Sequence, residues 1–261
     1  MTPAEPVVRR LRAAGCVFAE DEARLLLDTA GTPAELEELV GRRAAGEPLE
    51  HLLGWAEFCG LRIAVGPGVF VPRRRTELVV RLAVARAGRG DVVVDLCCGS
   101  GAVAAAVAAA VPGVAVHAAD LDPVAVAVAR RNLASGAVHQ GDLFDALPAE
   151  LRGRVAVLTA NAPYVPTAAI GLMPPEARDH EPRTALDGGV DGVDLHRRIA
   201  AGAPAWLAPG GVLLVETSER QAPATAAAMT ATGLRAEVVR DDELDATVAV
   251  GTRPPAGLPP P

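Results

Sequence analysis

The sequence Asp91-Val-Val-Val-Asp-Leu-Cys-Cys-Gly-Ser-Gly101 decides the fold of this chain. Within it, Val92–Leu96 is a short, mostly β-branched run typical of a strand buried on both faces, and the glycines that follow allow a tight turn. Ala102–Val111 has high helix propensity and contains no breaker. A second apolar run ends in Asp120, 19 residues after Gly101. A strand, a glycine turn, a helix, a strand and an acid in this order predict an α/β fold that binds an adenosine-bearing cofactor.

The glycine turn alone does not identify the cofactor. Gly99-Ser-Gly-Ala-Val-Ala104 also matches the dinucleotide pattern G-x-G-x-x-G/A, and a tight turn that binds no ligand has the same spacing. NAD and S-adenosylmethionine therefore both remain open on this motif. An acid at the end of the second strand can accept hydrogen bonds from both hydroxyls of a ribose, which suits either cofactor. The candidate cofactor-binding residues here are Asp95, Cys97, Cys98, Gly99, Ser100, Gly101, Asp120 and Leu121.

Composition narrows the class of protein. The chain has 261 residues, of which 50% are hydrophobic, so it can bury a sizeable core in one large domain or in a large and a small one. It contains no apolar run of roughly 18 residues and no signal-peptide pattern, so no membrane association is predicted. Its four cysteines lack metal-ligand spacing, which predicts no metal site and favours a reduced cytoplasm. The net charge of −7 opposes stable nucleic-acid binding, and we expect a monomer.

We expect residues 1–52 to form a small helical lobe. Apolar positions recur at near-helical spacing in Val7–Ala30, with a break expected near Gly15. Thr32–Ala45 begins with Thr-Pro, a common start of a helix. Residues 53–75 are expected to form a β-hairpin linker between this lobe and the rest of the chain.

The linker pattern consists of two apolar runs and a glycine-proline turn. We expect strands at Ala56–Val65 and Val69–Val71, joined by Gly66-Pro-Gly68. The arginine run Arg73–Arg75 follows, either as a solvated corner or as an edge beside the active site that contacts an anion or a partner. Thr76–Ala87 is then expected to be helical.

We expect residues 76–253 to form the main domain, with a seven-stranded Rossmann-like sheet. The proline-rich residues 254–261 are expected to be a disordered tail. The fourth strand, Val155–Ala160, runs directly into Asn161-Ala-Pro-Tyr164. Because ligands lie at the carboxyl ends of strands in an open α/β sheet, we expect the chemistry there. A long loop, Val165–Asp191, follows and is expected to contact the substrate or to form a lid.

Gly141-Asp-Leu-Phe144 follows a short third strand and has two interpretations. In the functional one, the segment caps the adenine of a cofactor, with Asp142 near the exocyclic amine and Leu143 or Phe144 on a ring face. In the other, a loop acid is followed by two core residues. The spacing fits both.

Asn161-Ala-Pro-Tyr164 suits methyl transfer to a planar NH2 group. An amide nitrogen is a poor nucleophile because its lone pair is delocalised, and a general base has no easily removed proton to take. The site must instead hold both N–H bonds, and the side-chain oxygen of Asn161 and the backbone carbonyl of Ala162 provide two acceptors. Pro163 keeps Ala162 extended, and Tyr164 can pack on the planar group. An ordinary Asn-x-Pro turn at a strand end is the alternative.

These motifs together resemble those of the bacterial protein-(glutamine-N5) methyltransferases that modify peptide-chain release factors. The resemblance extends over nearly the whole chain and is most specific where the fourth-strand motif is combined with Glu181-Pro-Arg-Thr-Ala-Leu-Asp-Gly-Gly189. It implies a class I methyltransferase fold with a helical N-terminal lobe. It also implies S-adenosyl-L-methionine as cofactor, S-adenosyl-L-homocysteine as product, and an exposed protein glutamine as acceptor, with a release factor as candidate substrate. The other matching segments are Ala45–Leu61, Val71–Glu77, Asp95–Gly101, Gly141–Phe144 and Asn161–Tyr164.

The resemblance also implies roles for individual residues. Cys97–Gly101 resembles the loop that holds the methionine and ribose parts of the cofactor, Asp120 the ribose acid, and Leu143 a neighbour of the adenine. Asn161–Tyr164 resembles the glutamine-binding motif. Three features depart from the family pattern: alanine in place of the first proline of Asn-Pro-Pro-Tyr, cysteine in place of the first glycine of the loop, and a shorter N-terminal lobe.

Three other functions fit parts of the sequence. An adenine-N6 nucleic-acid methyltransferase would use the same NH2-holding motif, but only the arginine run supports it and the acidic net charge opposes it. A binding module that keeps the fold without turnover would explain the two substituted motif positions. An NAD oxidoreductase would use the glycine turn, but it would leave the fourth-strand motif without a role.

Overall fold

Seven strands form one mixed sheet in the part of the chain that the structure, a computed structural model, describes, residues 4–255. Their spatial order is β5-β4-β3-β6-β7-β9-β8, with neighbours parallel from β5 to β7, and β9 antiparallel to both β7 and β8. This arrangement confirms the predicted α/β sheet of seven strands. The strands are β3 (Val92–Leu96), β4 (Ala115–Asp120), β5 (Ala137–Gln140), β6 (Val155–Ala160), β7 (Leu207–Thr217), β8 (Arg235–Asp241) and β9 (Ala246–Thr252).

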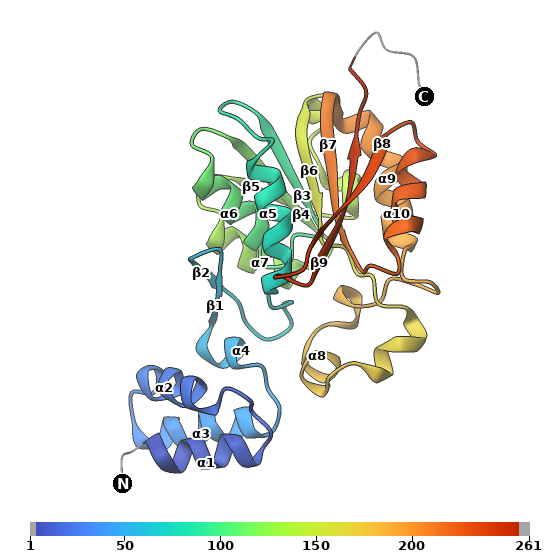
Figure 1. Ribbon diagram of the computed structural model, residues 1–261. Helices are drawn as coiled ribbons and strands as arrows, with labels where there is room; N and C mark the ends of the chain where they lie inside the picture. Colours follow the sequence, from blue (N-terminus) through green and yellow to red (C-terminus); the bar gives the residue numbers. More distant parts are fainter. Residues whose placement is uncertain (1–3, 256–261) are drawn as a thin grey trace.

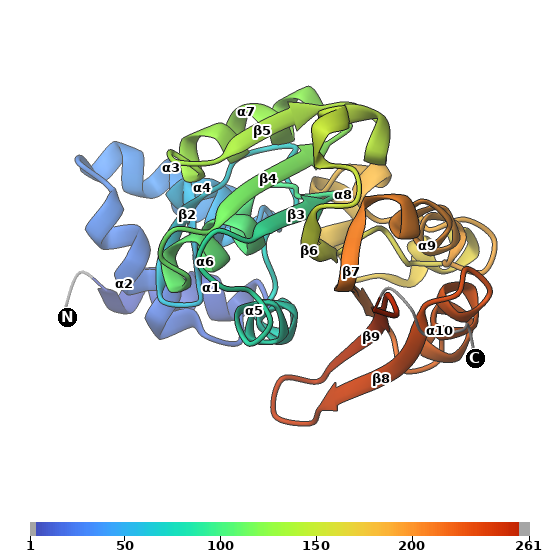
Figure 2. The same cartoon turned by 90° about the horizontal axis from the view of Figure 1, so that it is seen from above.

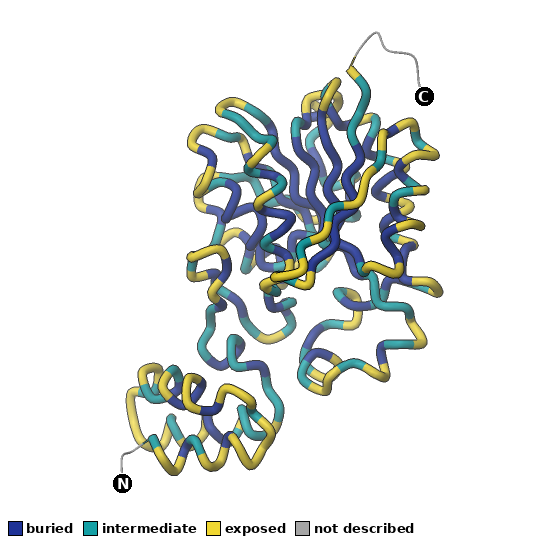
Figure 3. The backbone as a smooth tube through the Cα atoms, viewed as in Figure 1, coloured by how far each residue is buried: buried dark blue, intermediate teal, exposed yellow. Residues whose placement is uncertain are grey.

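Helices cover both faces of the sheet and make a three-layer fold (Figure 2). One face packs against α5 (Glu77–Val84), α6 (Ala102–Ala110) and α7 (Pro123–Asn132), and the other against α9 (Asp194–Trp206) and α10 (Ala222–Thr230). The central strands are buried along most of their length (Figure 3). Because α6 consists only of alanine and valine, it can bury its first six residues without large side chains separating it from its neighbours.

The helix expected at Thr76–Ala87 is shorter than predicted. A 3₁₀ turn, η1 (Arg74–Thr76), comes first, and α5 then ends at Val84. A competing interaction follows the helix, because the backbone N–H of Gly88 donates to the carboxylate of Asp91 at 2.7 Å. The chain therefore leaves the helix before Gly88 and turns toward β3.

The N-terminal helices pack around a core of their own, and Figure 1 shows them at one end of the molecule, apart from the sheet. Gly15 has a φ of 92° and lies between the first two helices, which confirms the break predicted there. The side chain of Thr32 caps the third helix by accepting from the backbone N–H of Glu35 at 3.2 Å. The helices are α1 (Ala4–Ala13), α2 (Ala19–Thr29), α3 (Pro33–Ala44) and α4 (Leu49–Leu53).

The hairpin turns at a different place from the one predicted. β1 (Trp55–Phe58) pairs antiparallel with β2 (Leu61–Ala64), so the turn is Cys59-Gly60 and the prediction of Gly66-Pro-Gly68 is wrong. Both turn residues have positive φ, 50° and 74°, the conformation that matches the twist of the strands in a two-residue hairpin. The predicted second strand, Val69–Val71, is irregular, and its backbone is bonded to side chains of other segments.

The long segment after β6 contains short helices instead of an open loop. A bridge between Val165 and Asp187 brings its two ends together. In Figure 1 this segment lies on the same end of the molecule as the N-terminal helices. It comprises η4 (Thr167–Leu172), α8 (Pro175–His180) and η5 (Arg183–Ala185), while η2 (Leu143–Ala146) and η3 (Ala149–Leu151) lie before β6.

Most of the predicted tail, residues 256–261, lies outside the described residues. The predicted domain boundaries after residues 52 and 75 stay predictions. Between residues 4 and 255, no helix combines the length and the apolar composition needed to cross a bilayer.

Candidate active site

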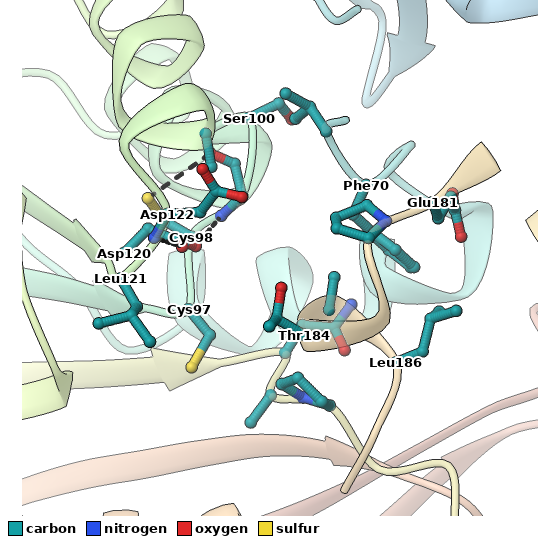
Figure 4. Close-up of a pocket in the computed structure, with 18 of the residues that line it drawn as sticks. Phe70, Cys97, Cys98, Ser100, Asp120, Leu121, Asp122, Glu181, Thr184 and Leu186 are labelled. Carbon is teal, nitrogen blue, oxygen red and sulfur yellow. Dashed lines mark hydrogen bonds between the residues drawn. The ribbon is translucent and has the colours of Figure 1, made fainter. Parts of the chain in front are cut away.

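A cavity of about 550 Å³ opens at the carboxyl ends of β3, β4 and β6. Figure 4 shows Cys97 and Leu121 on one side of it and Phe70, Glu181 and Leu186 on the other. Nearly all site residues predicted from the sequence gather here, whereas Gly101 does not line the cavity. Those that line it are Asp95, Cys97, Cys98, Gly99, Ser100, Asp120, Leu121, Asp142, Leu143, Asn161, Ala162, Pro163 and Tyr164.

The two glycines of the turn have different roles. Gly99 has a φ of 54° and lines the cavity, and a Cβ placed on it would meet no atom within 4 Å. Gly101 has a φ of 76°, and a Cβ there would come within 3.1 Å of the Cβ of Ala129 on α7. Gly99 therefore leaves room for a ligand beside the backbone, whereas Gly101 allows α6 and α7 to pack together.

Asp120 is held by backbone donors on both carboxylate oxygens. Its Oδ2 accepts from the N–H of Gly99 at 2.8 Å, and its Oδ1 accepts from the N–H of Asp122 at 2.9 Å. Burial raises the pKa of Asp120, and these two N–H groups oppose that rise. Because each oxygen keeps a free lone pair, the carboxylate is oriented to accept two further hydrogen bonds from a ligand in the cavity.

Asp95 lies beside the turn and is almost fully buried. Its Oδ1 accepts from the hydroxyl of Thr159 at 2.8 Å, while its Oδ2 has no hydrogen-bond partner among the described residues. Burial raises the pKa of Asp95 to about 7. The cavity wall thus carries one acceptor that has no hydrogen-bond partner within residues 4–255.

The segment after β5 contributes one of its two apolar residues to the cavity and the other to the core. Leu143 lines the cavity, whereas Phe144 stacks on Trp206, with ring centroids 5.7 Å apart, inside the core. Asp142 lies at the rim, and its carboxylate accepts from Arg198 at 2.7 Å. Of the two apolar candidates for a ring contact, only Leu143 is available to a ligand.

The fourth-strand motif presents its polar atoms to the same cavity. The Nδ2 of Asn161 donates to the Oγ1 of Thr76 at 3.2 Å, which leaves the Oδ1 of Asn161 without an internal donor in the described part of the chain. Ala162 is fully buried, and the hydroxyl of Tyr164 donates to Glu216 at 3.3 Å. His196 lies next to the motif, and burial lowers its pKa to about 4, although the Ala162 backbone acts to raise it. The imidazole of His196 is therefore neutral at pH 7.

Sequence reasoning missed the residues that hold the motif in place. Thr76 and Glu216 contact its side chains, and Gln221 donates to the backbone carbonyl of Tyr164 at 2.7 Å. Glu216 is the first charged residue after the apolar run of β7 and lies one residue before the end of that strand, so the signal that identified Asp120 could also have found Glu216. Thr76 and Gln221 carry no comparable signal because only the fold brings them to the motif.

The segment after β6 closes the other side of the cavity. The Oε1 of Glu181 accepts from the backbone N–H of Val71 at 3.1 Å and from Arg73 at 2.6 Å, and Glu181 is buried. Arg75 pairs with Glu216 at 3.3 Å. Two arginines of the run thus line the cavity, as one interpretation held, but each is already paired with a carboxylate.

Within residues 4–255, no group of three or more histidine, cysteine, aspartate or glutamate side chains is arranged to hold a metal ion. The polar atoms of the cavity are instead placed to accept hydrogen bonds, at Asp95, Asp120 and Asn161.

The fold and the position of the cavity define a class I methyltransferase. The family described as "Methyltransferase small domain" matches residues 61–170. A solved methyltransferase from Pyrococcus furiosus has the same fold, with a TM-score of 0.57 and 16% identity over 75% of this chain and 90% of that one.

Curated relatives narrow the class to a family. A release factor glutamine methyltransferase of Streptomyces coelicolor is 46% identical over 70% of this chain and 67% of its own length. One from Deinococcus radiodurans is 38% identical over 89% of this chain and 90% of its own length. A 4-amino-L-phenylalanine/4-methylamino-L-phenylalanine methyltransferase of Streptomyces pristinaespiralis is 41% identical over 86% and 79%. The chain belongs to the release factor glutamine methyltransferase family.

Proposed function

We propose that this chain transfers the methyl group of S-adenosylmethionine to the side-chain amide nitrogen of a protein glutamine, with a release factor as the first candidate substrate. The observation that carries the proposal is the orientation of Asn161. Its Nδ2 is engaged by Thr76, so its Oδ1 is free to accept an N–H from a group in the cavity.

The cavity fits the cofactor. Asp120 offers two oriented oxygens to a ribose, Leu121 and Leu143 offer apolar surface to an adenine, and Gly99 leaves space beside the backbone. The unpaired Oδ2 of Asp95 offers an acceptor to the ammonium group of the methionine part. When bound, S-adenosylmethionine supplies a methyl group already activated by its sulfonium.

The residues of the motif then position the acceptor. The Oδ1 of Asn161 and the backbone carbonyl of Ala162 accept the two N–H bonds of the glutamine amide, which turns the face of the nitrogen toward the cofactor. As positive charge develops on that nitrogen, the same two oxygens stabilise it. The ring of Tyr164 is fixed at the cavity wall through Glu216 and can cover the planar amide.

The test is methyl transfer from isotope-labelled S-adenosylmethionine to a purified release factor, with the labelled residue mapped by mass spectrometry. We expect one methyl group on one glutamine side chain and no transfer to the same protein with that glutamine replaced by asparagine. Label on a different residue type, or none on any protein of a cell lysate, would reject the proposed acceptor.

A second candidate acceptor is the aromatic amine of an amino acid. One relative named for such a substrate is as similar to this chain as the release factor enzymes are. An aniline nitrogen also carries two N–H bonds on a planar group, so the same two oxygens could hold it. Competition between 4-amino-L-phenylalanine and the release factor in the labelling assay separates the two, because we expect the protein to be the preferred substrate by kcat/KM.

A further inference from the structure

We propose that Gln221, at the start of α10, is a positioning residue for methyl transfer. Its side-chain amide holds both ends of the segment that leaves the sheet after Tyr164 and returns at Asp191, and so it keeps the acceptor-binding motif and this part of the cavity wall together as one unit. The inference rests on the proposed function, because it gives Gln221 a part in presenting the acceptor. Gln221 acts through Tyr164 and does not itself line the cavity.

The side-chain amide of Gln221 uses its nitrogen on two backbone carbonyls. Its Nε2 donates to the carbonyl of Tyr164 at 2.7 Å and to the carbonyl of Asp191 at 2.9 Å. Its Oε1 accepts from the hydroxyl of Ser218, just before α10, and the residue is 7% exposed. Because carbonyls only accept, the nitrogen of the amide must face them, and the two N–H bonds of Gln221 are both used.

The backbone also joins the two ends of this segment. The N–H of Val165 donates to the carbonyl of Leu186 at 3.0 Å, and the N–H of Gly188 donates to the carbonyl of Val165 at 2.9 Å. The chain between these ends carries Glu181 and Leu186, which line the cavity. Backbone pairing thus closes the segment at its base, and Gln221 fixes that base to α10, an element outside the segment.

Two glycines make room for this contact. A Cβ on Gly192 would come within 2.1 Å of the Nε2 of Gln221 and within 2.3 Å of the carbonyl oxygen of Tyr164. A Cβ on Gly188 would come within 2.7 Å of both the carbonyl oxygen of Pro163 and the Cα of Tyr164. The absence of a side chain at these two positions therefore allows the hydrogen bond between Gln221 and the motif to form.

The same hydrogen bond fixes the backbone of the acceptor-binding motif. β6 pairs with β3 and β7 as far as Ala160, so the sheet holds the motif at one end. Gln221 holds its other end at Tyr164. Between these anchors, the ring of Pro163 fixes one φ and restricts Ala162 to extended conformations. The directions of the Ala162 carbonyl and of the Tyr164 ring, which meet the acceptor in the proposed function, therefore depend on both anchors.

The experiment compares three variants by kcat, by KM for S-adenosylmethionine and by affinity for S-adenosylhomocysteine. Gln221→Met keeps a long, unbranched side chain and removes both N–H donors. Gln221→Glu replaces the NH2 group by an oxygen that faces the two carbonyls. Gln140→Met makes the first substitution at an exposed glutamine at the end of β5 and is the control. All three are assayed as the full-length protein.

We expect Gln221→Met to lower kcat about 10²-fold, the effect of a misplacement of the acceptor by about 1 Å. KM for S-adenosylmethionine and the affinity for S-adenosylhomocysteine should change less than about threefold, because the cofactor part of the cavity lies at the ends of β3 and β4. Gln140→Met should match the unmodified enzyme. A kcat of Gln221→Met within about threefold of the unmodified value, or a loss of cofactor affinity as large as the loss of kcat, would overturn the proposal.

A pH profile separates the loss of the two donors from a general loosening of the fold. Burial raises the pKa of the new carboxyl group in Gln221→Glu, and once protonated its O–H can donate to one of the two carbonyls. The ratio of its kcat to that of the unmodified enzyme should therefore rise several-fold as the pH falls from about 8 to about 6. The same ratio for Gln221→Met should not change. A ratio for Gln221→Glu that is constant with pH would contradict the role of the donors, and this profile decides if Gln221→Met does not fold.

Amide hydrogen exchange tests the inference without any activity. We expect exchange across residues 165–191 to become about tenfold faster or more in Gln221→Met, while exchange in the strands of the sheet stays as in the unmodified protein. Unchanged exchange across this segment would contradict the inference even if no protein substrate were methylated. Absence of methyl transfer by the unmodified enzyme would reject the proposed function alone.

Discussion

Cys97 occupies a backbone conformation that favours glycine. Its φ is 54°, in the left-handed region, where a residue with a Cβ pays about 1–2 kcal/mol. Its thiol lines the cavity, and burial raises its pKa, so the group is a neutral wall of the cavity at pH 7. Cys97, which replaces the first glycine of the family's loop, is thus strained in its backbone but carries an unreactive, neutral thiol.

Replacing this cysteine should therefore stabilise the fold. We expect Cys97→Gly to raise the free energy of unfolding by about 0.5–1 kcal/mol, the left-handed cost less the entropy cost of glycine. Denaturant unfolding measures the change. Cys98→Gly is the matched control, because Cys98 is buried and has no positive φ, and that change should destabilise. A loss of stability in Cys97→Gly equal to that of the control would contradict the account.

Asn161 and Asp120 should separate transfer from cofactor binding. Asn161→Ala removes an acceptor for the methylated group, and we expect methyl transfer to fall at least about 10²-fold while affinity for S-adenosylhomocysteine stays within a few fold. Asp120→Asn replaces one carboxylate oxygen by a donor, and we expect that affinity to fall roughly tenfold or more. Calorimetry and initial rates on both variants make the comparison. Equal losses of affinity would contradict the separate roles.

At the scale of the elements, strand ends carry the site. β3, β4 and β6 end in the glycine turn, Asp120 and Asn161, and their parallel pairing brings these ends to one edge. The end of β7 adds Glu216 to the same edge. Each of these site residues can be recognised in the sequence as a polar residue at or just after the end of an apolar strand. This signal is local, because it needs only neighbouring residues.

Features with such a local signal could be predicted from the sequence, whereas features that depend on distant residues could not. The sheet, the cavity and the fourth-strand motif followed from apolar runs and the residues that end them. The turn at Cys59-Gly60 did not, because a cysteine with positive φ has no local signal beside the stronger pattern Gly66-Pro-Gly68. The sequence could not show that Leu143 lines the cavity while Phe144 packs in the core. Phe144 stacks on Trp206, which lies more than sixty residues away in the sequence and contacts Phe144 only in the folded chain.

The buried acid at β3 predicts a pH dependence. The pKa of Asp95 in the fold is about 7 against an ordinary value of 3.8, so the folded chain holds this proton more tightly than the unfolded one. Its contribution to stability is complete below pH 3.8 and is lost as the pH rises to about 7. Asp95→Asn, which keeps a neutral side chain, should gain stability relative to the unmodified protein over that interval.

The measurement is denaturant unfolding of both proteins, without cofactor, at a series of pH values. The difference between them should change by about 1.4 kcal/mol for each unit of pKa difference, up to a few kcal/mol in all. A difference that stays constant with pH would show that Asp95 is not held protonated in the fold.

At the scale of the whole molecule, one arginine joins three separate segments. Arg43 on α3 pairs with Glu22 on α2 at 2.7 Å and with Glu176 on α8 at 3.4 Å. The first pair is nearly buried, with side chains 10% and 11% exposed. The N-terminal helices are thereby tied to the segment that closes the cavity, on the same end of the molecule (Figure 1).

Breaking the Arg43 ion pairs should reduce the free energy of unfolding more than breaking an exposed ion pair does. We expect Arg43→Met to lower the free energy of unfolding by about 3 kcal/mol, because it leaves Glu22 buried without its partner. Arg42→Met, which breaks a more exposed pair with Glu47, should cost less than about 1 kcal/mol. Thermal and denaturant unfolding compare them. Equal costs for the two variants would contradict the role given to Arg43.

The most direct test of the central claim is a crystal structure of the chain with S-adenosylhomocysteine and a glutamine-containing peptide of a release factor. We expect the glutamine nitrogen about 3 Å from both the Oδ1 of Asn161 and the carbonyl oxygen of Ala162, with its face toward the cofactor sulfur. Asn161 turned away from the sulfur, with no space for a carboxamide between them, would contradict the claim.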